Sequence, residues 1–144
     1  MRQFLKRRLG SIFAIALTIA IVSPTVIAAS VTPRTAYQRA KYTVPVGGGT
    51  WNGKDVGHLW GLTTDETVFN VSVTSSSIKT VSADLYKVVV WAPDDWIDGI
   101  NNFTGGPGDW TRTAPFYVTD TSSAYYATVT SKDSRGAQGW VSVM

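Results

Sequence analysis

Few side chains in this sequence of 144 residues could catalyse a reaction. His58 is the only histidine, and Asp55 precedes it by three positions. A serine hydrolase needs a nucleophile beside such a base, but the chain contains no GxSxG turn that would expose a serine. The single histidine excludes a multi-histidine zinc site, and the lack of cysteine excludes thiolate sites. We therefore expect no catalytic site, no metal site and no cofactor.

Acidic and amide side chains gather between positions 94 and 102. Their oxygens could hold calcium, but their spacing does not match the DxDxDG pattern with its distant glutamate. The alternative is turn chemistry, in which Asp and Asn side chains bond nearby backbone groups. Glycoside hydrolysis would need a second carboxyl group at a defined separation, and nothing in the sequence places one. The pattern favours turns for Asp94, Asp95, Asp98, Asn101 and Asn102.

Exposed aromatic side chains are the remaining candidates for binding. Trp96 and Trp110 lie in or beside a glycine-rich segment, and Tyr125 and Tyr126 are adjacent. Such rings stack on sugars or anchor protein interfaces. A small chain without disulfides also needs most of its aromatic residues inside. The candidate binding residues are Trp51, Trp96, Trp110, Tyr125 and Tyr126.

Residues 1–28 have the pattern of a secretory signal peptide. Four basic residues and no acid stand in the first eight positions, and an apolar run extends from Ile12 to Ile21. Pro24 follows, and small residues then offer a cleavage site after Ala28. An uncleaved anchor is the alternative, but a span needs about 20 apolar residues. We expect a secreted protein with no membrane span after processing.

Cleavage would change the charge of the protein. The whole chain has 13 basic and 10 acidic residues and a net charge of +3. Loss of the four basic residues leaves nine basic against ten acidic residues, a net charge of −1. The basic balance therefore belongs to the precursor, and we expect no nucleic-acid partner.

The remainder of the chain has strand patterns and no helical period. Residues 29–42 are polar and basic, which predicts a flexible lead-in, and residues 43–144 form one predicted domain. Turn-forming residues at 93–108 predict a long loop, and 116–118 with 124–129 predict a hairpin. Another predicted strand begins near Thr43, and three more cover residues 67–74, 79–91 and 139–143. Five to seven short strands predict an all-β fold, a small antiparallel β-sandwich.

A glycine triplet precedes the first tryptophan. Gly47, Gly48 and Gly49 indicate positive φ angles or close backbone approach, and no GxxxxGK[ST] pattern makes them a phosphate loop. We expect the triplet to turn the chain while Trp51 packs over the start of the sheet. Gly139 and Trp140 are assigned the same structural role in the last strand.

Two segments resemble the lactococcin 972 family of secreted bacterial bacteriocins. Residues 46–53 (VGGGTWNG) are similar to the family's GGGTW opening, and residues 126–140 resemble its ATV strand, serine-rich turn and Gly-Trp strand. Family members are cysteine-free exported peptides that fold as small antiparallel β-sandwiches and act on the envelope of related bacteria. A cell-wall precursor is their implied target. Residues from Gly61 to about Pro115 have no counterpart in the family pattern.

The resemblance implies a secreted, non-enzymatic, bacteriocin-like factor that acts on the bacterial cell envelope. The expected partner is a bacterial cell-wall component or precursor. The alternative is a secreted adhesive or carbohydrate-binding β-sandwich module, which would bind glycans without inhibiting growth. A hydrolase is a third possibility, and it would depend on His58.

Overall fold

The computed structural model describes residues 38–144. The expected signal peptide and residues 29–37 of the expected lead-in lie outside these residues. All elements of the described part are β-strands, and their number exceeds the five to seven predicted. They are β1 (Gln38–Val44), β2 (Gly49–Asn52), β3 (Trp60–Gly61), β4 (Glu66–Thr67), β5 (Phe69–Val73), β6 (Lys79–Lys87), β7 (Asp95–Gly105), β8 (Trp110–Arg112), β9 (Phe116–Tyr117), β10 (Ala124–Ser131) and β11 (Ala137–Val143).

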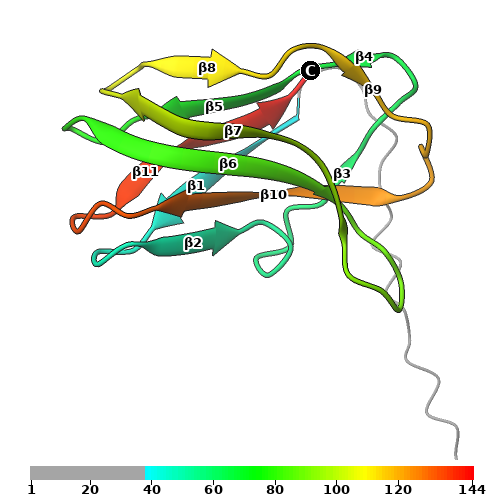
Figure 1. Ribbon diagram of the computed structural model, residues 1–144, viewed down its shortest axis with the longest axis horizontal. Coiled ribbons are helices and arrows are strands. Elements are labelled where there is room, and N and C mark those ends of the chain that lie inside the picture. Colours follow the sequence, from blue (N-terminus) through cyan, green and yellow to red (C-terminus); the bar gives the residue numbers. More distant parts are fainter. Residues whose placement is uncertain (1–37) are drawn as a thin grey trace, which may run out of the picture.

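The strands form two large antiparallel sheets (Figure 1). The four-stranded sheet has the order β1-β11-β5-β8, and the five-stranded sheet has the order β2-β10-β6-β7 with β3 also paired to β10. A short pair, β4 with β9, stands apart from both. The first and last strands of the described chain are therefore neighbours in one sheet.

One hydrophobic cluster contains the inward-facing side chains of both large sheets. Alternate residues of each strand point to the same face, so the apolar residues of the Val-rich strands gather on one side. Tyr42 and Val71 of the four-stranded sheet and Leu85 and Val129 of the five-stranded sheet are all fully buried in this cluster. The two sheets thus bury their inner faces against a common core.

The glycine triplet carries the chain from one sheet to the other. It links β1 in the four-stranded sheet to β2 in the five-stranded sheet, and Gly49 is the first residue of β2. Gly47, Gly48 and Gly49 have φ angles of 96°, 85° and 132°, which L side chains rarely adopt. A Cβ on Gly48 would also lie 2.9 Å from the carbonyl oxygen of Ser131. Trp51 follows in β2, partly buried and packed against the core cluster.

The N-terminal boundary of the domain differs from the predicted one. Residues 38–42 were expected to belong to the flexible lead-in, but they form most of β1 and pair with β11. Ala40 and Tyr42 alternate with Arg39 and Lys41, so one face of the segment is buried and the other carries charge. This alternation has the period of a strand. The segment was nevertheless predicted to be flexible because its exposed positions are basic.

The predicted loop at residues 93–108 is wrong over most of its length, because only residues 93–94 and 106–108 lie outside strands. Asp95–Gly105 form β7, the longest strand, which pairs with β6 along its length. Register irregularities and a positive φ of 51° at Asn102 accommodate residues that favour turns. The end of the predicted strand at 79–91 is also wrong, because β6 stops at Lys87 and residues 88–91 belong to the connection to β7. Whether a segment at the edge of a sheet becomes a strand thus depends more on hydrogen bonding to a neighbouring strand than on the strand preference of its own residues.

The predicted hairpin of residues 116–118 with 124–129 does not form. Phe116 and Tyr117 pair with β4, whereas β10 lies between β2 and β6 in the five-stranded sheet. Asp120 holds the intervening turn, accepting hydrogen bonds from the backbone N–H groups of Ser122 and Ser123 at 3.0 and 3.1 Å. Both segments are strands, but the turn directs them to different partners.

Candidate functional site

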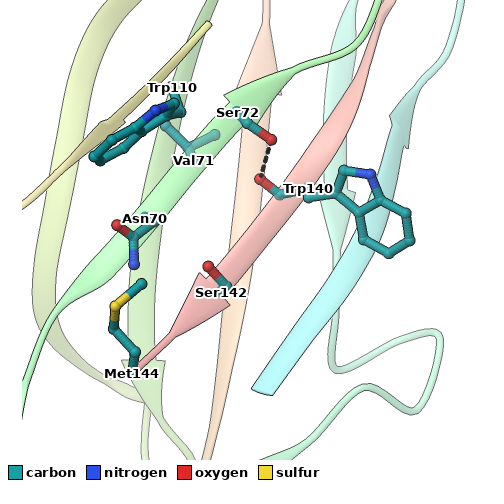
Figure 2. Close-up of a pocket in the computed structure, with 7 residues that line it drawn as sticks. All are labelled: Asn70, Val71, Ser72, Trp110, Trp140, Ser142 and Met144. Carbon is teal, nitrogen blue, oxygen red and sulfur yellow. Dashed lines mark hydrogen bonds between the residues drawn. The ribbon is translucent and has the colours of Figure 1, made fainter. Parts of the chain in front are cut away.

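A trough crosses the outer face of the four-stranded sheet (Figure 2). In the register, Trp140 of β11 stands opposite Ser72 of β5, and Ser72 stands opposite Trp110 of β8. Side chains that face one another in register point to the same side of a sheet. The trough therefore has an indole at each side and a small hydroxyl group between them. It has a volume of about 230 Å³ and is lined by Asn70, Val71, Ser72, Trp110, Trp140, Ser142 and Met144.

The two indoles stand far enough apart to admit a ligand. Their strands are separated by β5, so two strand spacings, about 9–10 Å, lie between their backbones. Trp110 is 61% exposed. The indole of Trp140 extends away from Trp110 toward β1, where the guanidinium of Arg39 lies 4.5 Å from its ring centroid (Figure 2). The aromatic sides are thus splayed rather than stacked on each other.

Polar side chains form the floor of the trough. Asn70 and Ser142 stand opposite each other and are only 7% and 6% exposed, although they lie on the outer face of the sheet. The Asn70 amide donates a hydrogen bond to the Val68 carbonyl at 3.3 Å, and the Ser72 hydroxyl donates one to the Trp140 carbonyl at 3.4 Å (Figure 2). The Asn70 carbonyl oxygen and the serine hydroxyls are groups that can pair with a bound hydroxyl or amide.

The rim of the trough is basic. Arg39 of β1 stands opposite Ser142, and Arg112 of β8 stands opposite Asn70, so the two arginines occupy the ends of one register row. Lys41 stands opposite Trp140 in the next row. Among the outward positions of these four strands, the charged residues are all basic. This face is complementary to an anionic ligand or surface.

The sequence-predicted aromatic residues do not come together. Trp110 lines the trough, whereas Trp96 is 56% exposed on β7 of the other sheet, where its Nε1 donates a hydrogen bond to Asp84 at 3.0 Å. Trp51 packs against the core. Trp140, which was assigned a structural role beside Gly139, lines the trough as well.

Tyr125 and Tyr126 are not exposed, so their proposed role as surface contacts is wrong for this structure. They are 1% and 6% exposed because β10 is a central strand with neighbours on both sides. Tyr125 points into the core, and Tyr126 is covered on the outer face by the stacked ring of Tyr86, 5.5 Å away between centroids. Buried aromatic residues of this kind contribute stability rather than ligand contact.

The sequence reasoning missed the floor and the basic rim. A usable signal was present, because Asn70 and Ser72 alternate with buried residues in the segment FNVSV. Ser142 does the same between Val141 and Val143. Small polar residues on the outward face of two adjacent Val-rich strands indicate a surface lined for polar contact. Their partnership depends on β5 pairing with β11, which no local pattern reveals.

The acidic residues at 94–98 are engaged in ion pairs and hydrogen bonds within the protein. Asp94 pairs with Lys54 at 2.7 Å, Asp95 pairs with Lys87 at 3.0 Å, and Asp98 accepts a hydrogen bond from the Gly99 N–H at 2.8 Å. Within residues 38–144, no three His, Cys, Asp or Glu side chains are grouped so that they could hold a metal ion. His58 is exposed and lies beside Trp51, with 6.1 Å between ring centroids.

Asp120 makes the stability of the protein sensitive to acid. Hydrogen bonds from the hydroxyls of Ser123 and Ser122, at 2.7 and 2.8 Å, lower its pKa to about 2 from 3.8. Because the folded pKa lies below the unfolded one, the ionised carboxylate stabilises the fold above pH 3.8. That contribution is lost as the pH falls toward 2.

We expect the urea midpoint to be steady near neutral pH and to fall as the pH drops below about 4. Asp120→Asn removes part of this dependence, so the midpoints of variant and wild type converge in acid. Ser76→Ala, at an exposed position between β5 and β6, removes no titratable group and serves as the control. A profile that is identical in wild type and Asp120→Asn would contradict the assignment.

Comparison with known proteins gives this chain no family. No protein-family model matches it, and no curated protein matches it. Within the described residues, the fold includes no helix of the length and apolar character required to traverse a bilayer.

Proposed function

We propose that this protein is an exported, non-enzymatic, bacteriocin-like factor that binds the bacterial cell envelope through the trough. The observation that carries the proposal is the pair of indoles, Trp110 and Trp140, flanking a polar floor on the outer face of a sheet. Indole faces pack against the apolar faces of sugar rings, and hydroxyl and amide groups orient a ligand by hydrogen bonds. A wall glycan offers both kinds of contact.

Two further features support this function. The two antiparallel sheets around one core are consistent with a β-sandwich, the fold that the resemblance to the lactococcin 972 family implies. The basic rim suits a bacterial envelope, whose polymers and lipids carry negative charge. Arg39 and Arg112 would contact carboxylate or phosphate groups at the two ends of the trough.

Removal of one indole tests the proposal. Trp110→Ala is expected to weaken retention on isolated bacterial cell walls by about tenfold or more, because the stacking surface on one side of the trough is lost. The variant should unfold at nearly the wild-type temperature, since Trp110 is 61% exposed. Pull-down on walls over a range of protein concentrations measures the effect.

Trp96→Ala is the matched control, because Trp96 is comparably exposed at 56% but lies on the other sheet. It should be retained like the wild type. Equal retention of wild type and Trp110→Ala would overturn the assignment of the trough. Growth inhibition on bacterial lawns tests the antibacterial part of the proposal, and it should fall in parallel with wall binding.

The second candidate is a secreted adhesive or carbohydrate-binding module, which the same trough supports. Binding to a glycan array without inhibition of any lawn would favour it. In that case Trp110→Ala would abolish array binding, because the ligand contacts are the same.

A further inference from the structure

The connection between β6 and β7 forms an apolar tip. It extends beyond the sheets at one end of the molecule (Figure 1). Six consecutive apolar residues, VVVWAP at 88–93, lie between Lys87 and Asp94. Val90 is 57% exposed and Trp91 is 84% exposed, the highest exposure among the large hydrophobic side chains of the described residues. We call residues 88–93 the β6–β7 tip.

The backbone presents Trp91 to solvent in an unfavourable conformation. Its φ is 69°, in the left-handed region that bulky residues seldom occupy. Such conformations persist where the surroundings enforce them, and they gather at functional sites. Here no burial of the indole compensates for the strain within the chain. The strain and the exposure together suggest that Trp91 is buried by a partner.

The base of the tip is held firmly. The carboxylate of Asp94 accepts hydrogen bonds from the Val89 N–H at 2.9 Å, from Lys54 at 2.7 Å and from the Tyr126 hydroxyl at 2.8 Å. The Val88 N–H donates to the carbonyl of Ala124 at 2.8 Å. Burial alone would raise the pKa of Asp94, but these hydrogen bonds outweigh it and lower the pKa, so the carboxylate is ionised at neutral pH. The tip is therefore preformed, with its apolar end projecting from an anchored base.

Charges at the base are paired. Asp94 is matched by Lys54, and the adjacent Asp95 is matched by Lys87 at 3.0 Å. The two carboxylates that directly follow the tip in the sequence are thus neutralised, which lowers their repulsion by anionic lipid and the cost of dehydrating them. A tip built for a specific protein partner would carry polar groups to fix its orientation, but all six side chains are apolar.

We infer that the β6–β7 tip docks on a lipid bilayer, inserting Val90 and Trp91 at the level of the headgroups. Tryptophan concentrates at this level of membranes, and valine, alanine and proline have no polar side-chain group to leave unsatisfied there. The apolar run is far shorter than the about 20 residues that span a bilayer, so the tip remains at the interface. This inference is independent of the trough, which lies on the other sheet.

The test is flotation with vesicles of phosphatidylcholine, alone and mixed with phosphatidylglycerol. The variant is Val90→Ser with Trp91→Asn, because asparagine tolerates the left-handed backbone. We expect the wild type to float with both kinds of vesicle, and the variant to bind at least about tenfold more weakly. The control variant, Val46→Ser with Ile78→Ser, removes apolar side chains that are 81% and 68% exposed in other turns, and it should bind like the wild type.

Three results would overturn the inference. The first is a tip variant that binds vesicles like the wild type. The second is binding that requires phosphatidylglycerol and is lost in Arg39→Gln with Arg112→Gln but not in the tip variant, which would assign lipid contact to the basic rim. The third is a wild type that does not float but self-associates through the tip, as shown by sedimentation velocity. The proposed binding of cell walls by the trough is tested separately. Trp110→Ala should bind walls more weakly but float with vesicles like the wild type.

Discussion

Gly139→Ala is expected to unfold the protein under conditions in which the wild type is folded. Gly139 lies in β11 between β1 and β5, and a Cβ there would overlap the carbonyl oxygen of Ser72. The same Cβ would lie 2.6 Å from the hydroxyl oxygen of Tyr42, which donates a hydrogen bond to that carbonyl at 2.9 Å. The obstructing atoms are backbone and a fully buried ring, so neither can move aside without disturbing the sheet.

The expected loss is about 3 kcal/mol or more of the free energy of unfolding, because the sheet must separate to admit the methyl group. Thermal unfolding followed by circular dichroism should show a fall in Tm of roughly 15 °C or more. Gly106→Ala is the control, since its Cβ would meet only ordinary contacts at 3.7 and 3.9 Å and its φ is not positive. Tyr42→Phe should not rescue Gly139→Ala, because the Ser72 carbonyl remains. A rescued double variant would show that the hydroxyl alone excludes the methyl group.

Trp51→Ala is expected to have the second largest effect on stability. Trp51 lies in β2, two residues after Gly49, and packs against the core cluster, with its ring 6.4 Å from that of Tyr42 between centroids. Truncation of a buried tryptophan costs about 3–5 kcal/mol, and partial burial reduces this to about 2–3 kcal/mol. The corresponding fall in Tm is roughly 10–15 °C.

Wall binding by Trp51→Ala separates a structural role from a contact role. If the indole is structural, binding at a temperature where the variant is folded should equal that of the wild type. A variant with wild-type Tm that no longer binds walls would instead make Trp51 a contact residue. Trp96→Ala, which removes an indole 56% exposed, should change the free energy of unfolding by less than about 0.5 kcal/mol.

Local patterns were sufficient for the class of structure. Val71 and Val73 alternate with polar residues, as do Val81 and Leu85, and all four are buried in strands. Side-chain alternation is a property of the extended backbone itself, so it can be read from neighbours in the chain. The positive φ angles of the glycine triplet are similarly local, because only glycine adopts them without strain.

Local patterns did not predict which segment forms an edge strand or which strands pair with each other. The segment that forms β7 has the composition of a turn, and it becomes a strand because β6 supplies hydrogen-bond partners along its length. Residues 88–91 have the composition of a strand, but β6 ends at Lys87 and the hairpin reverses there, which leaves Val90 and Trp91 exposed. In both segments a non-local contact outweighs a preference of at most about 1 kcal/mol.

The trough shows the same division most clearly. The sequence by itself determined that Trp110 was a candidate contact and that the segment containing Val71 and Val73 would be a strand. Only the tertiary structure decided that β5 would lie between β8 and β11, which brings Trp110 and Trp140 to opposite sides of Ser72. Strand order depends on how whole faces of two sheets bury one core, and this free energy belongs to no single segment of the chain.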